Sequence, residues 1–576
     1  MRETTLALID RLAESAVGLP YSVDKVCNLL SEIGEAGDTM AVIGVYPLLC
    51  SELNLIVTSL TPGGLGGVLV RLNLTTERTC YTVPEEVRSA AVVCISRLIS
   101  AVHIEKLPEI DTKLRLYNSW WGVSPRWSAW ATPAPPDPST VQGLPGASLA
   151  IGALSTARSG FVREAAVRQL CMRTSNEGFP FLLWRATDWV QEVRVLANTA
   201  VLERLADVRY LPDFANALPL LNRMEKMERL DLSYLTSLVR SRLLEEPGRA
   251  SLVTGLQSRN MHVRRACADV LGRVQPVPEI GVIKQVAAHQ DIILRHRAME
   301  WEARLRTVDP DAAQALRWKF INDKSSGLRV AALRAEVEVD GPGLLELLWR
   351  CTSDDAVAVR ECARYHIRRL VGNVDFAQHY RKIIEQDEAC LHAAISGLGE
   401  TGTPPDYDIV CQYLNGPRRQ KACALKAMAR LGPIRVRSAA IALLFDDSGP
   451  IRSIALDIAG SHISDNEADV SIAHLTKNTA HGVMTSLVIA TNRMEQWKAL
   501  DVLLSAAYVV PSTDVSIEAI EKWGTEKFNI YYRPRHLRAV EQDKFRDKLA
   551  AIVNRLTVTT VERLTMDIEG RLRWHR

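Results

Sequence analysis

The sequence has few cysteines and none in the pairs that bind zinc or build a disulfide framework. Its 576 residues include 11 Cys, and no two of them form a Cys-x-x-Cys pair. Three of them, Cys267, Cys362 and Cys423, lie where a repeated pattern described below places small residues. We therefore interpret the cysteines as reduced packing residues of a cytoplasmic protein, and we expect no metal site and no disulfide framework.

A signal-type N-terminus and a long uninterrupted apolar run are also missing. An acidic residue, Glu3, follows almost at once after the first methionine, and no signal-type apolar core comes next. The longest apolar stretch, residues 41–60, is interrupted by Pro47 and Glu52. We expect a pair of buried helices there, no membrane partner and a cytoplasmic location.

Charge bias and catalytic motifs are absent as well. Lys and Arg total 70 and Asp and Glu total 67, a net charge of +3, so electrostatic recognition has to be local. The phosphate-loop, zinc-protease and serine-hydrolase motifs do not occur. The glycine-rich stretch 62–67 lacks a trailing Lys, so we read it as a turn. We expect a protein that is not an enzyme and that holds no cofactor.

What the sequence does contain is a repeat: an apolar residue, an Arg, and a small residue three places further on. Between most neighbouring copies the Arg position recurs at intervals of 30 to 34 residues. The regular copies are Val162-Arg163 with Ala166, Val193-Arg194 with Ala197, Val263-Arg264 with Cys267, Leu294-Arg295 with Ala298, Leu328-Arg329 with Ala332, Val359-Arg360 with Ala363, and Ile451-Arg452 with Ala455.

Two degenerate copies and one gap complete the array. Leu391 and Lys421 take the Arg position in the degenerate copies. The gap between Arg194 and Arg264 spans 70 residues, which predicts an unrecognised copy near residues 227–234. A fixed period of this length is typical of a solenoid.

An Asp or Asn precedes the Arg position in most copies by four to six residues. Such residues commonly cap the first turn of a helix, and apolar stretches with helical spacing lie on both sides of them. Each repeat is therefore predicted to be helix, turn, helix. The predicted caps are Asp188, Asn260, Asp291, Asp323, Asp354 with Asp355, Asp387, Asn415, and Asp446 with Asp447.

These residues resemble the HEAT repeat, especially the short bacterial type found in phycobilin-lyase-like proteins. Residues 258–272 match its pattern closely, and the resemblance extends from residue 150 to about residue 490. It implies an all-α fold, an α-solenoid of HEAT-like helical hairpins with divergent capping regions at both ends. It also implies that the repeated arginines pair with the Asp of neighbouring turns, as a structural ladder rather than a ligand-binding stripe.

Composition divides the chain into four parts. Residues 1–131 form a divergent helical region, 132–146 a Pro-rich linker or loop, 147–490 the repeat array, and 491–576 a C-terminal helical cap with a basic aromatic segment. Proline ends helices, which places the boundary at the linker.

The first candidate binding segment is a cluster of tryptophans just before the linker. Trp120, Trp121, Trp127 and Trp130 lie within eleven residues and are four of the 12 Trp in the chain. Large rigid rings at such density suit a partner-binding hot spot. The alternative is that these rings fix the linker onto the first repeats.

The second candidate segment is basic and aromatic. From residue 521 to the end there are thirteen Lys or Arg and eight Asp or Glu. Aromatic faces beside Arg suit base stacking and phosphate neutralisation, and a structural cap is the alternative. The candidate nucleic-acid or anion-binding residues are Tyr531, Tyr532, Arg533, Arg535, His536 and Arg538.

The pattern favours a noncatalytic protein-interaction scaffold or adaptor, one subunit of a larger assembly, because a solenoid offers an extended binding surface. The alternative is a nucleic-acid-binding HEAT-repeat protein of DNA repair or defence. A lyase of the phycobilin-lyase-related group is a third reading, which the lack of recurring His and Glu pairs disfavours. The repeat type and the composition suggest a bacterial cytoplasm.

Overall fold

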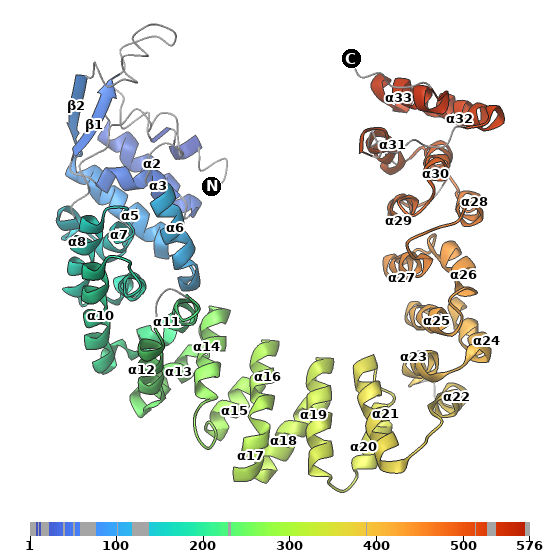
Figure 1. Cartoon of the computed structure of the whole chain (residues 1–576), viewed down its shortest axis with the longest axis horizontal. Helices are drawn as coiled ribbons and strands as arrows, with labels where there is room; N and C mark the ends of the chain where they lie inside the picture. The colour runs from blue at the N-terminus through green and yellow to red at the C-terminus, as the bar shows by residue number, and fades with distance from the viewer. Residues whose placement is uncertain are drawn as a thin grey trace. The chain divides into compact units, whose positions relative to one another are not determined.

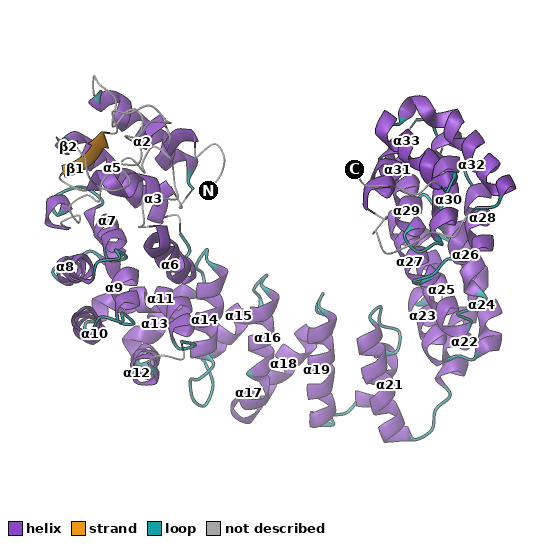
Figure 2. Ribbon diagram, turned by 45° about the horizontal axis from the view of Figure 1, so that its top comes forward, coloured by secondary structure: helices purple, strands orange, loops and turns teal. Residues whose placement is uncertain are grey.

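The chain is described by a computed structural model that covers 7–9, 11–12, 22–38, 41–49, 52–57, 77–100, 102–117, 138–227, 232–386, 389–477, 479–512, 514–526 and 537–570. Most of these residues are helical (Figure 2). They form two compact units, Met1–Leu316 and Arg317–Arg576. The division falls inside α18 (Pro310–Ile321), in the middle of the repeat array.

Unit 1 carries five consecutive helical hairpins, which follow one another along the chain in Figure 1. Each hairpin has a first helix, a short turn and a second helix. The pairs are α7 (Ala147–Leu154) with α8 (Gly160–Cys171), α9 (Phe179–Arg185) with α10 (Gln191–Ala206), α11 (Leu211–Met224) with α12 (Ser233–Leu244), α13 (Glu246–Gly255) with α14 (Met261–Leu271), and α15 (Ile280–Ala287) with α16 (Ile292–Glu300), followed by α17 (Glu302–Val308).

The region before the hairpins is helical except for one pair of strands. In the antiparallel pair, Glu52 lies opposite Thr82 and Val57 opposite Glu77. In residues 41–60 the expected helix pair is therefore found only over 42–49, where Val42, Val45, Leu48 and Leu49 are buried. The expectation is wrong for 52–57, which pairs with a strand whose Thr and Tyr residues favour extended backbone. The elements are α2 (Val23–Ala36), α3 (Val42–Val45), η2 (Tyr46–Leu49), β1 (Glu52–Val57), β2 (Glu77–Thr82), α5 (Glu85–Ser100), η3 (Ile104–Lys106), α6 (Leu107–Tyr117) and η5 (Pro138–Val141).

Helix α6 is fastened to the second hairpin through buried charges. Asp111 lies 2.7 Å from Nη2 of Arg185 and accepts a 2.9 Å hydrogen bond from the indole N–H of Trp184. Arg115, one turn further along α6, reaches Asp188 in the turn before α10 at 3.4 Å. The repeat array in unit 1 thus begins against a helix that the repeat pattern does not include.

Unit 2 begins with the last residues of α18 and continues the hairpins to Ile568. Helices therefore continue to Ile568, through the described part of the region expected to be a C-terminal helical cap. The elements are α19 (Ser326–Val339), α20 (Leu344–Cys351), α21 (Val357–Val371), α22 (Phe376–Gln386), α23 (Leu391–Thr401), α24 (Tyr407–Cys411), α25 (Arg418–Leu431), α26 (Val436–Leu443), α27 (Gly449–Ala459), α28 (Asp465–Ala473), α29 (His481–Thr491), α30 (Gln496–Val509), α31 (Val515–Glu526), α32 (Ala539–Ile552) and α33 (Val558–Ile568). Short 3-10 segments complete the two units: η6 (Asn176–Gly178), η7 (Val208–Tyr210), η8 (Pro404–Asp406), η9 (Gln412–Asn415) and η10 (Val553–Arg555).

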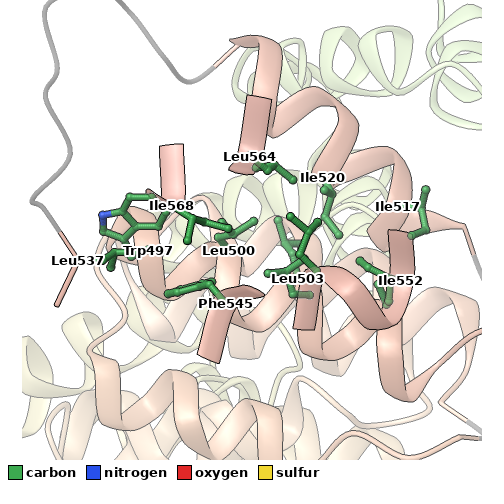
Figure 3. Close-up of a cluster of buried hydrophobic side chains, with 13 residues drawn as sticks. Trp497, Leu500, Leu503, Ile517, Ile520, Leu537, Phe545, Ile552, Leu564 and Ile568 are labelled. Atoms are coloured by element: carbon green, nitrogen blue, oxygen red, sulfur yellow. The ribbon is translucent and has the colours of Figure 1, made fainter. Parts of the chain in front are cut away.

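The last two hairpins share one apolar core. Figure 3 shows Trp497 from α30 near Phe545 from α32, with ring centroids 5.6 Å apart. Leu564 and Ile568 of α33 close the cluster with 0% and 1% exposure. Burial of such rings and branched chains contributes about 1.5–3 kcal/mol per side chain, so this end of the array has a core of its own.

The repeated Arg makes the same two backbone bonds in every regular copy. Its Nη1 donates to the carbonyl oxygens of the residues six and five places earlier, which lie in the turn between the two helices of the hairpin. The distance to the carbonyl six places earlier is 2.6 to 3.0 Å in Arg163, Arg194, Arg264, Arg295, Arg329, Arg360 and Arg452. These bonds give hydrogen-bond partners to backbone carbonyls of the turn and tie the turn to the second helix.

The link to the neighbouring turn is less regular. Arg163 donates to Asp188, Arg329 to Asp354 and, in a degenerate copy, Lys421 to Asp446, each pair being 25 residues apart. Arg360 pairs instead with Glu400, and Arg452 donates to Ser486. Ion pairs between neighbouring turns are therefore present in some copies. The bonds from the repeated Arg to the backbone carbonyls are found in every regular copy.

Two of the predicted caps are N-caps: Asn260 and Asp291 accept from the N–H groups of His262 and Ile293. Four others lie two residues before the N-cap and accept from the N–H of the N-cap residue itself, in a turn that precedes the helix. Asp355 and Asp447 lie one residue before the N-caps Ala356 and Ser448, so they are not N-caps either. The N-cap interpretation is wrong for Asp188, Asp323, Asp354 and Asp446, Asn415 ends a 3-10 helix, and Asp387 lies outside the described residues.

The unrecognised repeat is the hairpin of α11 and α12. Thr236 takes the Arg position at the start of α12, preceded by Leu235 and followed by Val239. It is 42 residues after Arg194 and 28 before Arg264. The 70-residue gap is therefore divided unequally, and not into two units of 35 residues. Thr236 is buried and donates to the backbone carbonyl of Ser233 and to Glu225.

Candidate protein-binding groove

The tryptophan cluster expected from the sequence lies outside the described residues. Trp120, Trp121, Trp127 and Trp130 all fall between Tyr117, the last residue of α6, and Pro138, the first of η5. They stay predictions.

Most of the basic aromatic segment also lies outside the described residues, namely Tyr531, Tyr532, Arg533, Arg535 and His536. Its last member, Arg538, is the N-cap of α32. The side chain is 82% exposed, and its Nε lies 3.3 Å from the carboxylate of Glu541. The charge of Arg538 is therefore partly balanced by a residue one turn further on.

A groove lies between α19 and α21, in unit 2. These are the second helices of adjacent hairpins, and they lie side by side in Figures 1 and 2. The groove has a volume of about 830 Å³. Small residues at its base, among them Val330 of α19 with Ala358 and Cys362 of α21, leave the space that longer side chains border. We call this feature the α19/α21 groove.

Apolar and aromatic side chains are exposed along the α21 wall. Tyr365 is 62% exposed and Leu370 is 50% exposed, and both line the groove. A tyrosine ring presents a large rigid surface with a polar end, which is the kind of side chain enriched at interface hot spots. Val337 adds an apolar contact from α19.

Charges of both signs line the same groove. Arg334 and Arg369 contribute guanidinium groups, and Glu338, Asp340 and Glu361 contribute carboxylates. Within the described part of the chain, neither arginine forms an ion pair with a carboxylate. Mixed charges at an interface fix the partner's register and exclude wrong partners more than they raise affinity.

Cys362 and His366 lie one helical turn apart in the groove. Burial raises the pKa of the Cys362 thiol, although Arg334 opposes this, so the thiol is protonated near neutral pH. Burial and the charges of Arg369 and Arg334 lower the pKa of His366. A protonated thiol is a poor nucleophile, and this arrangement suits recognition better than nucleophilic catalysis.

The sequence analysis did not predict this groove, because the residues that line it occupy positions that the repeat pattern does not specify. Arg334 and Tyr365 stand five places after the repeated Arg of their hairpins, and Glu338 and Arg369 nine places after it. Comparing those two columns between copies would have found Tyr365, the aromatic residue among shorter or charged ones.

Among the described residues, no three His, Cys, Asp or Glu side chains come together in a way that could hold a metal ion. Within the same residues no single helix is long and apolar enough to cross a membrane. The two helical segments Glu85–Ser100 and Ile104–Thr112, which meet at a bend, are together long and apolar enough to span one, judged by length and composition alone.

Comparisons with known proteins add little to the fold described above. No protein-family model matches the chain, and no curated protein matches its sequence. A structure of Kap95p with RanGDP covers 98% of this chain and 70% of its own, at 12% identity and a TM-score of 0.28. Yeast importin-β (Kap95p) covers 98% and 63% at 12% identity and 0.25. UNC-45 from Drosophila melanogaster covers 96% and 81% at 13% identity and 0.19.

The TM-scores of these neighbours are too low to support an argument about fold or function. The fold is an α-solenoid of HEAT-like hairpins, and its bacterial phycobilin-lyase-like subtype has no support from the comparisons.

Proposed function

We propose that the protein is a noncatalytic cytoplasmic scaffold or adaptor subunit that binds a protein partner in the α19/α21 groove. The observation that carries the proposal is the pair Tyr365 and Leu370, exposed at 62% and 50% on the wall of an 830 Å³ hollow. A hollow of this size holds several side chains of a peptide segment. The match of residues 258–272 to the short bacterial repeat supports a bacterial origin.

A photo-crosslinking residue in place of Tyr365 tests this proposal. In extract of the native host it is expected to capture a protein of one discrete mass, and the same residue in place of Ile434 is not. Ile434 is 86% exposed in the same unit and does not line the groove, so it is a matched control.

The affinity for the captured protein then measures how much Tyr365 and Leu370 contribute to binding. The double variant Tyr365→Ala with Leu370→Ala is expected to weaken binding about 30-fold or more, since a hot-spot residue contributes about 2 kcal/mol or more. Ile434→Ala is expected to change it less than twofold. Equal effects of the two variants, with unchanged helical circular dichroism, would contradict the proposal.

The second candidate is nucleic-acid binding by the C-terminal segment, favoured by its thirteen Lys or Arg against eight Asp or Glu. Binding to single-stranded DNA or RNA that falls steeply with salt, and that Arg533→Ala with Arg535→Ala abolishes, would support it. No binding at low salt would remove it.

A further inference from the structure

A separate apolar pocket lies in unit 1, where four segments of the chain meet. Its volume is about 270 Å³. The segments are the end of α5, the turn from η3 into α6, the helix α7, and the start of α9. Buried residues form its base, with Ile99 7%, Leu107 4%, Leu149 9% and Phe181 2% exposed.

The pocket is held open by structure on each side. The ring of Phe181 packs directly on Gly152 of α7, where a Cβ atom would overlap the ring. Asp111 fixes α6 to Arg185 and Trp184 of α9 by the contacts at 2.7 and 2.9 Å described above. A preformed pocket spends little binding free energy on ordering its walls.

The volume limits what the pocket can hold. Pockets for drug-sized ligands measure roughly 300–1,000 Å³, and 270 Å³ lies below that range. A single large side chain, aromatic or branched, is a better match. Ile104 and Ile110, each partly exposed at the mouth, would contact the base of such a side chain.

One carboxylate gives the pocket its electrostatic preference. Glu177, exposed at the mouth, is the charged residue among those that line it. Among the described residues Glu177 has no cationic partner. A basic residue next to the inserted side chain would pair with it, and such an exposed pair contributes about 0.2–1 kcal/mol.

We propose that this pocket binds a segment of a partner protein in which one large apolar side chain, such as Trp or Leu, stands next to Lys or Arg. The proposal does not depend on the α19/α21 groove, because the pocket belongs to the other unit.

The probe is the dipeptide acetyl-Trp-Lys-amide, added to the full-length protein labelled at the isoleucine δ1 methyl groups. Ile99, Ile104 and Ile110 provide three methyl signals in the pocket, assigned by single Ile→Val variants. All three are expected to shift and to saturate with a Kd on the order of 1 mM, while the signal of Ile451 in unit 2 stays unchanged. Acetyl-Gly-Lys-amide, which lacks the large side chain, is expected to shift none of them.

Charge and occupancy are tested by matched changes. Acetyl-Trp-Glu-amide is expected to bind about threefold or more weakly than the Lys probe, and Glu177→Gln is expected to bring that ratio to about one. Val102→Trp, a change at the partly exposed mouth, is expected to abolish the shifts. Because that variant could perturb the fold, unchanged signals outside the pocket are its control.

Three results would overturn the proposal. The first is no shift of the three methyl signals with either Trp probe. The second is a Lys-to-Glu preference that Glu177→Gln leaves unchanged. The third is a shift of the same signals by Trp127→Ala without any probe, which would show that this chain, and not a partner, fills the pocket.

Discussion

Replacing Asp188 by Asn should destabilise unit 1 far more than the equivalent change elsewhere in the array. Asp188 accepts from Nε and Nη2 of Arg163 at 2.9 and 3.0 Å and from Nη1 of Arg185 at 2.9 Å. The two arginine side chains are 0% and 1% exposed. Burial alone would raise the pKa of Asp188, but the hydrogen bond from Arg163 and the charge of Arg185 hold it below its usual range.

The magnitude follows from what the neutral side chain leaves behind. Asn keeps the bond to the N–H of Val190, but it leaves Arg163 and Arg185 with less negative charge in a buried site. Breaking a buried pair in this way costs about 3–5 kcal/mol.

Asp354→Asn is the matched control in unit 2. Asp354 pairs with Arg329 across the same 25 residues and makes the same turn bond to Ala356, but the two partners are 17% and 16% exposed. Solvent compensates for part of the loss there, and we expect a cost of about 1 kcal/mol.

Hydrogen exchange measured by mass spectrometry separates the two effects, because unfolding of a long repeat array is not two-state. Asp188→Asn should accelerate exchange of the slow amides in α8 and α10 about 100-fold or more, and Asp354→Asn should accelerate those of α19 and α21 less than tenfold, at about 1.4 kcal/mol per factor of ten. Equal accelerations at the two sites would refute the reasoning that burial decides the magnitude.

Two further substitutions test local features of unit 2. Arg437 hydrogen-bonds Glu467 and lowers the pKa of Glu467 to about 2. This carboxylate therefore stabilises the fold above pH ~4.5, and its contribution is lost as pH falls toward 2. Glu467→Gln should cost about 1–2 kcal/mol at pH 7, measured by the hydrogen-exchange protection of amides in α26 and α28, with little difference from the unmodified protein near pH 2. Gly397→Ala should cost about 1–3 kcal/mol, because its Cβ would overlap the buried ring of Tyr380, whereas Gly281→Ala in α15, with open space around the new methyl, should be neutral or stabilising by up to about 1 kcal/mol; equal effects would count against the close contact.

The period of the repeat could be predicted from the sequence because the repeated Arg makes the same backbone hydrogen bonds inside each hairpin. Arg163 and Arg452 stand nearly 300 residues apart and make the same two carbonyl bonds. Where a different residue takes the Arg position, as Thr236 does, the pattern no longer marks the hairpin. The surrounding helices still form there because their apolar faces pack against neighbours.

Features that depend on tertiary contacts could not be read from one sequence. The strands Glu52–Val57 and Glu77–Thr82 are separated by a long stretch of chain, and the glycine-rich turn expected at 62–67 does not show which residues on its two sides pair. Tyr365 gives no local sign that it lies opposite Arg334 on another helix. Leu107 and Phe181 are distant in sequence, and each would be assigned to an ordinary apolar helix face.

The bond from the repeated Arg to the turn between the two helices of its hairpin spans only six residues. Every atom that it joins belongs to a single hairpin, so its formation does not require any particular neighbour. Loss or duplication of one whole repeat would leave these bonds intact in all the others, and only the residues that meet across the new junction would need to adapt. The array can therefore change its length by whole repeats during evolution, which suits it to acquiring new binding surfaces one hairpin at a time.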